Sequence, residues 1–103
     1  LGDIDSAIEN YIHAIEIDPN AYKIHYRLAS AFNLKNQYED AKISAKECLN
    51  IKRNYAPAYF ELGISEKALG NKVAATDAFE KAKKDKNWRK SAQFELDMLI
   101  KGF

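Results

Sequence analysis

The two histidines are the residues in this chain best suited to acid–base catalysis near neutral pH. They are His13 and His25, and they fall in different predicted helices. Of the serines, Ser6 stands near a predicted helix start and Ser30 in mid-helix, and neither lies in a Gly-x-Ser-x-Gly context. We therefore expect His25 to occupy a packing position and His13 to face solvent or a neighbouring helix.

Other residue types that can carry chemistry also lack a supporting pattern. The carboxylate neighbours Glu39 and Asp40 are typical of a solvated helix face, and "GNKVAAT" lacks the spacing of a phosphate-binding loop. Cys48 is the single cysteine, so it can form neither an internal disulfide nor a thiolate metal site. We predict a protein that is not an enzyme and that needs no cofactor and no metal.

Composition narrows the class of partner. The chain has 103 residues, about one domain, and is 47% hydrophobic and 30% charged with a net charge of +1. A nearly neutral chain gives no indication of nucleic acid binding. No apolar run approaches the roughly 20 residues of a membrane span, and "LGDIDS" is not a signal peptide. We expect no nucleic acid partner, no membrane insertion and a cytoplasmic location. The start at Leu1, partway through a repeated pattern, suggests a fragment of a longer protein.

The elements that position these residues follow from an internal repeat, whose period is the spacing from Ala7 to Ala41. The stretch "AIENYIHAIEIDPNA" returns more weakly, one period later, as "AKISAKECLNIKRNY". Matching positions hold similar residues: small at Ala7, Ala41, Ala75 and at Ala14, Cys48, Ala82; leucine at Leu28, Leu62, Leu96; aromatic at Tyr26, Phe60, Phe94; and Gly2, Asn36, Gly70. Small residues seven apart share one helix face and let a neighbouring helix approach closely.

Each period holds two helices, and no long strand-like alternation is present. Apolar spacing predicts helices over 5–17, 22–35, 38–51 and 72–84. Asn36 and Gly70 fit the left-handed residue that follows a helix end, and Asp18 before Pro19 ends the first helix. The connecting loops are short, so neighbouring helices are expected to be antiparallel.

The motif "AYFELGISEKALGNKVAATDAFEKA" and the ending Asp18-Pro19-Asn20 resemble the tetratricopeptide repeat family, whose characteristic period matches the one found here. The resemblance implies an all-α solenoid of antiparallel helix pairs in a right-handed superhelix. It divides the chain into the second helix of a truncated repeat (1–21), two complete repeats (22–55 and 56–89) and a C-terminal capping helix (90–103). Departures from the family pattern occur at Arg53, Asn87, Glu66 and His25.

The resemblance also implies a binding surface, because in this family the first helix of each pair lines a concave groove. The implied groove residues are Lys23, Tyr26, Ser30, Asn33, Phe60, Ile64, Lys67, Phe94, Met98 and Lys101. Helical spacing independently puts 26, 30 and 33 on one face, and likewise 60, 64, 67 and 94, 98, 101. An aromatic ladder beside lysines suits an apolar peptide or helix with acidic groups. We therefore predict a non-catalytic interaction module that binds a peptide or helix of a partner protein.

Some members of the family hold acidic chaperone tails with a carboxylate clamp of Lys, Asn and Arg. The matching positions here hold Tyr26 and Ser30, then Pro57 and Glu61, so we expect no such role. The alternative to groove binding is an assembly module. Residues 1–20 carry a charge of −5 and residues 81–90 a charge of +5, which would suit end-to-end association. The apolar face of helix 5–17 also favours self-association.

Overall fold

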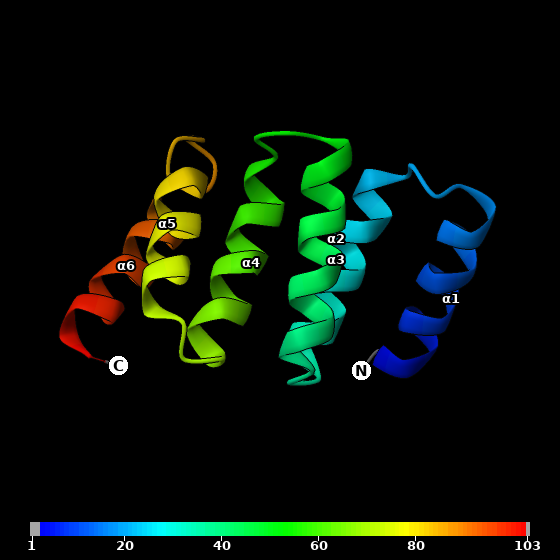
Figure 1. Cartoon of the computed structure of the whole chain (residues 1–103), viewed down its shortest axis with the longest axis horizontal. Helices are drawn as coiled ribbons and strands as arrows, with labels where there is room; N and C mark the ends of the chain where they lie inside the picture. Colours follow the sequence, from blue (N-terminus) through cyan, green and yellow to red (C-terminus); the bar gives the residue numbers. More distant parts are fainter. Residues whose placement is uncertain (1–2, 103) are drawn as a thin grey trace.

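The chain folds into a row of six antiparallel helices, described here from a computed structural model. The structure describes residues 3–102, and this range contains no strand. The helices are α1 (Ile4–Ile17), α2 (Tyr22–Leu34), α3 (Tyr38–Ile51), α4 (Ala56–Ala68), α5 (Lys72–Ala82) and α6 (Arg89–Lys101). They follow one another along the longest dimension of the molecule, which measures 41 Å (Figure 1). The prediction of an all-α solenoid is confirmed.

The helix boundaries follow local chemistry. At the start of α1, the Asp3 carboxylate accepts a hydrogen bond from the backbone N–H of Ser6 at 3.1 Å, which satisfies an otherwise unpaired helix donor. The α1 helix stops before Asp18-Pro19, as predicted. Asn36 has a φ of 61° and Gly70 a φ of 83°, so the left-handed turns are confirmed at both positions.

The predicted ranges need small corrections at the ends. The helix expected at 22–35 ends at Leu34, and the helix expected at 72–84 ends at Ala82. Asn54 adopts a left-handed φ of 62° that no sequence pattern predicted. Gly2, which aligns with Asn36 and Gly70, lies outside the described residues, as do the ends of the segments 1–21 and 90–103.

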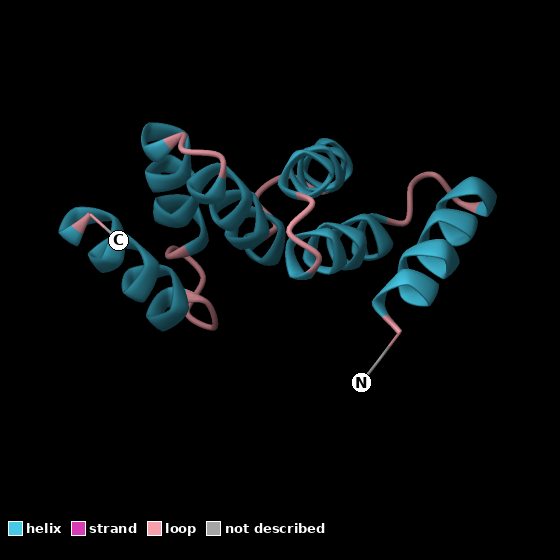
Figure 2. Ribbon diagram, turned by 90° about the horizontal axis from the view of Figure 1, so that it is seen from below, coloured by secondary structure: helices cyan, strands magenta, loops and turns pink. Residues whose placement is uncertain are grey.

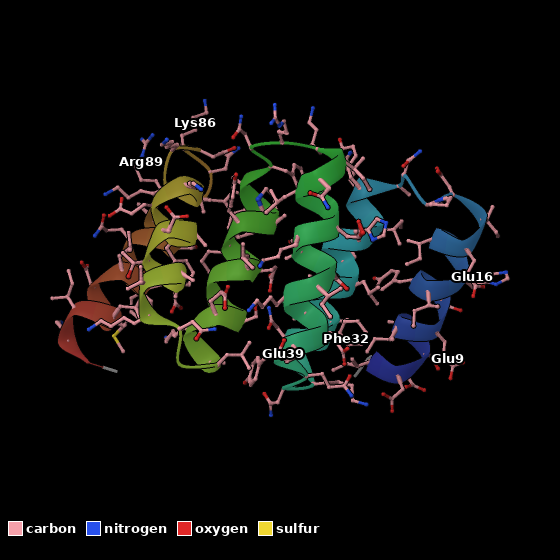
Figure 3. The ribbon with its side chains drawn as sticks, viewed as in Figure 1. Glu9, Glu16, Phe32, Glu39, Lys86 and Arg89 are labelled. Carbon is pink, nitrogen blue, oxygen red and sulfur yellow. The ribbon has the colours of Figure 1, made fainter. Side chains whose placement is uncertain are left out.

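The helices after α1 form two rows, with the main core between them. Figure 2 shows α3 and α5 on one side of the molecule and α2, α4 and α6 on the other. The main core lies between α4, α5 and α6, and its buried members are Ala75, Phe79, Ala82, Ala92, Leu96 and Leu99. A smaller cluster of Ile8, Leu28 and Ala31 joins α1 to α2, with Phe32 packed against it (Figure 3). The first helices of the pairs therefore form one continuous face.

Candidate functional site

The predicted groove residues all lie on the helices of this face, α2, α4 and α6. Their accessibility differs widely. Lys23, Phe94 and Lys101 are exposed, whereas Asn33 is buried; the remaining six, Tyr26, Ser30, Phe60, Ile64, Lys67 and Met98, are half-buried. The set is thus divided between residues that solvent reaches freely and residues held by neighbouring helices.

The aromatic ladder is held in place mainly by packing inside the protein. The Tyr26 ring lies edge-on to Tyr55, with ring centroids 5.9 Å apart. Phe60 packs between Phe79 at 5.5 Å and Trp88 at 5.1 Å. Phe94, by contrast, is 60% exposed. Only part of each of the first two rings is therefore available to a ligand.

Two polar groove residues join successive first helices. The Asn33 side-chain amide on α2 donates to Glu61 Oε1 on α4 at 2.8 Å. One period further on, Lys67 Nζ on α4 donates to Glu95 Oε1 on α6 at 2.8 Å. Both members of the second pair stand one period after those of the first. These bonds connect α2 to α4 and α4 to α6. The two glutamates that accept them are absent from the predicted groove set.

The surroundings of the Glu61 carboxyl group shift its pKa. Burial raises the pKa of Glu61 above its ordinary value of 4.5, and hydrogen bonds from Asn33 and Ser30 partly oppose the shift. Because the unfolded chain loses this proton at a lower pH than the folded chain, the contribution of Glu61 to stability falls as pH rises past the ordinary glutamate range. A negative charge at this position therefore weakens the fold near neutral pH.

We expect Glu61→Gln to increase the free energy of unfolding at pH 7 relative to the unchanged chain, and to do so less at pH 4. Glutamine keeps an oxygen that accepts from Asn33 but carries no charge to desolvate. Urea unfolding at the two pH values measures both differences. The matched control is Glu95→Gln, which removes a close ion pair with Lys67 and should lower stability at pH 7. An equal gain for Glu61→Gln at both pH values would contradict the explanation.

Two clefts open along this part of the molecule. One, of about 530 Å³, lies where the C-terminal parts of α4 and α6 meet the first residues of α3 and α5, Tyr38 and Lys72. Its lining residues include Ile64, Lys67 and Leu99. The other, of about 390 Å³, lies between α1 and α2, and its lining residues include Tyr26 and Ser30. Four of the ten predicted groove residues therefore line a cleft. The structure does not gather the other six around either one.

The residues considered for catalysis are accounted for by local contacts. His25 is buried, with Nε2 2.9 Å from the Pro19 carbonyl oxygen, as expected for a packing residue. His13 is exposed, and its nearest charged partner is Glu16 at 3.6 Å. Burial raises the pKa of the Cys48 thiol to about 11, so a reactive thiolate is disfavoured.

Within residues 3–102, no group of three or more His, Cys, Asp or Glu side chains is placed to hold a metal ion. Across the same range, none of the helices combines the length and apolar character needed to cross a membrane. The clamp positions also lack the required chemistry. Tyr26 packs on Tyr55, and Glu61 would present a carboxyl group rather than a cation to an acidic tail.

Comparisons with known proteins agree with this architecture. A sequence profile described as "TPR repeat" matches residues 1–35, and one described as "Tetratricopeptide repeat" matches residues 22–55. Small glutamine-rich tetratricopeptide repeat-containing protein 2 of Mycosarcoma maydis is 33% identical over 79 residues, which cover 77% of this chain and 22% of the relative. Heat shock protein STI1 of Saccharomyces cerevisiae is 30% identical over 98 residues, which cover 94% of this chain and 17% of that relative. The chain thus spans about a fifth of the length of these curated relatives.

Solved structures share the fold. The first TPR of Spaghetti (RPAP3), bound to the HSP90 peptide SRMEEVD, matches with a TM-score of 0.93 at 23% identity, over 98% of this chain and 80% of that one. MamA matches with a TM-score of 0.90 at 27% identity, over 98% of this chain and 59% of the MamA chain. At the lower identity the likeness concerns the fold alone.

Proposed function

Because the chain belongs to the tetratricopeptide repeat family, we propose that it is a non-catalytic interaction module that holds a peptide or helix of a partner protein against α4 and α6. The observation that carries this proposal is the cleft of about 530 Å³ that both helices line. Apolar Ile64 and Leu99 line it, and Lys72 stands in its wall. A ligand with apolar side chains beside a carboxylate would match this lining.

Chaperone tails are not the ligand that we propose. The HSP90 peptide is bound by the RPAP3 repeat domain, whose likeness to this chain is a likeness of fold. An acidic C-terminal peptide needs several cations directed into the groove. Here Lys67 is already paired with Glu95, and Glu61 lies where a clamp cation would be needed. A cytoplasmic location is part of the proposal and agrees with the single, free Cys48.

We expect Ile64→Ser to weaken ligand binding at least ten-fold, because Ile64 lines the cleft. The probes are peptides selected from a displayed library of random dodecamers against the unchanged chain, with affinities measured by isothermal titration calorimetry. Ile43→Ser is the matched control, since Ile43 lies on α3 and is 62% exposed. Circular dichroism checks that both variants stay helical. Peptides that lose affinity for the Ile43 variant instead would place the binding surface on the other side of the array.

Assembly into a scaffold is the second candidate function, and the charge of the two ends favours it. Figure 3 shows Glu9 and Glu16 projecting from α1 at one end of the molecule and Lys86 and Arg89 around the α5–α6 loop at the other. Opposite charges steer two surfaces toward each other. Such stacking also needs an apolar contact, for which the apolar face of α1 is the candidate.

A further inference from the structure

A basic edge of the molecule is formed by two loops, the α3–α4 loop at residues 52–55 and the α5–α6 loop at residues 83–88. Figure 1 shows both loops at the same edge, opposite the edge where α1 begins and α6 ends. A cavity of about 370 Å³ lies between them, and its lining residues are Asn54, Ala56, Tyr59, Lys81, Lys84 and Asp85. This basic edge therefore has a pocket that could receive part of a ligand.

The helices that pack against α5 are all part of the described chain. Each second helix packs mainly against the first helices before and after it, so α3 packs on α2 and α4, and α5 packs on α4 and α6. Because contacts in a repeat array run between neighbours, repeats added at either end would lengthen the row and leave this edge uncovered. The cavity is therefore open to solvent whatever the length of the array.

Most cations of the basic edge have no acidic partner. Four of them are exposed and belong to none of the ion pairs found within residues 3–102: Arg53, Lys84, Lys86 and Arg89. Figure 3 shows Lys86 and Arg89 projecting around the α5–α6 loop. Lys84 is the member of this group that lines the cavity.

The acidic residues near the cavity already have partners inside the chain. Two of them lie beside lysines at the end of α5: Asp77 with Lys81 at 3.0 Å, and Glu80 with Lys83 at 3.6 Å. Asp85 Oδ1 accepts a hydrogen bond from the backbone N–H of Asn87 at 2.8 Å. The charge that remains uncompensated at this edge is therefore positive.

The other second helices show that the fold does not require these cations. Lys84 occupies the register of Glu16 and Asn50, one and two periods later in the chain. The last turns of α1 and α3 contain no basic residue, whereas the last turn of α5 contains Lys81. Stabilisation of the helix dipole would favour a cation at the end of all three helices. Cations gathered at one of the three favour a role in ligand binding.

An acidic protein segment fits this edge better than nucleic acid or a membrane surface. Proteins hold single-stranded nucleic acid by stacking its bases on aromatic rings. Here the Trp88 ring packs on Phe60 at 5.1 Å, and Lys81 Nζ lies 5.5 Å from the centre of the Tyr59 ring. None of the large apolar side chains exposed within residues 3–102 lies in either loop, so the edge offers a membrane nothing apolar to insert.

A second copy of the chain offers few free carboxylates for this edge. Of the acids near its N-terminus, Asp3 accepts from Ser6 at the start of α1, and Asp5 pairs with Lys35. The remaining acids are spread along a rigid helix. An extended acidic segment, by contrast, presents a carboxylate at every residue.

We propose that the basic edge binds an extended segment of a partner protein that is rich in Asp and Glu, with one carboxylate in the cavity beside Lys84. Neighbouring carboxylates of the segment pair with Arg53 and Lys86 through charge-assisted hydrogen bonds. A single exposed pair contributes little, so several must form together, and binding should weaken as salt is added. The site lies at the opposite end of α4 from the cleft of the proposed function, so it stands whether or not a ligand binds there.

The test titrates the full chain into a fluorescein-labelled dodecapeptide of alternating Glu and Asp at low ionic strength and follows fluorescence anisotropy. Lys84→Glu should weaken binding about ten-fold, because it replaces an attraction by a repulsion, and adding Arg53→Glu should weaken it further. Lys46→Glu is the matched control: Lys46 is exposed in the middle of α3, away from both loops, and should change the affinity less than about two-fold. A dodecapeptide of alternating Gln and Asn should not bind.

Several results would overturn the proposal. No binding of the acidic peptide, or equal losses for Lys84→Glu and Lys46→Glu, would show that the edge forms no site. Tighter binding of a thymidine dodecanucleotide, or of phosphatidylcholine–phosphatidylserine vesicles, would assign the edge to nucleic acid or a membrane. A dimer in sedimentation velocity that Lys84→Glu dissociates would make a second copy the occupant. Circular dichroism checks that all variants stay helical.

Discussion

Replacing Phe79 by alanine is expected to lower the free energy of unfolding by about 3–5 kcal/mol, the cost of removing a large buried ring whose space the structure cannot refill. Phe79 is 0% exposed and sits in the main core, with its ring against Phe60. The loss is a large part of the roughly 5–15 kcal/mol available to a small domain. Chemical denaturation measures it directly. Val73→Ala on the same helix is the control, because Val73 is 85% exposed and should change stability by less than about 0.5 kcal/mol.

The Phe79 ring also determines whether Gly63→Ala raises or lowers the free energy of unfolding. In the unchanged chain Gly63→Ala should destabilise, because the new methyl group would overlap the Phe79 ring and overpacking costs about 1–3 kcal/mol. In the Phe79→Ala background the overlap disappears, and the better helix propensity of alanine should instead stabilise by up to about 1 kcal/mol. The double variant reproduces the Ala29 and Ala45 pair of the preceding repeat. A double-mutant cycle with no change of sign would refute this matching of sizes.

The repeat made the helices predictable, because small residues seven apart, a helix-ending proline and the left-handed Asn36 and Gly70 are all local signals. The packing of α6 against the main core was also foreseeable, because Leu96 keeps the register of Leu28 and Leu62. These features depend on the chain's own geometry over one or two turns. They require no knowledge of how one helix crosses the next.

The state of the groove residues was less predictable, because it depends on contacts between helices. The face of α2 that carries Asn33 follows from helical spacing, but the reach of its amide to Glu61 depends on the angle between α2 and α4. Phe60 is covered partly by Trp88, which stands in a loop whose path has no periodicity to read. The role of the ten residues in ligand binding therefore stays a prediction, with Ile64 and Phe94 better placed than Asn33.

Glu66 is the position where the sequence departs most from an apolar core. It is 4% exposed, and the same register holds Phe32 and Ile100 in the neighbouring repeats. Its Oε1 accepts from the Asn71 side-chain amide at 2.8 Å and lies 3.3 Å from Lys42 Nζ on α3. The departure was visible in the sequence, but the partner was not, because Lys42 belongs to the preceding repeat. When a buried carboxylate has one cationic partner, removing that partner leaves an uncompensated buried charge and strongly destabilises the fold.

We expect Lys42→Met to lower the free energy of unfolding by about 2–4 kcal/mol, somewhat below the cost for a fully buried pair, because the Lys42 side chain keeps 24% exposure. The double variant Lys42→Met, Glu66→Leu should recover most of the loss, since apolar packing replaces the pair without leaving a charge behind. Lys83→Met is the control: it breaks an exposed pair with Glu80 and should cost no more than about 0.5 kcal/mol. Urea unfolding of the three variants measures these differences in the free energy of unfolding. A double variant no more stable than Lys42→Met would mean that the cost lies in the lost lysine packing and not in the stranded charge of Glu66.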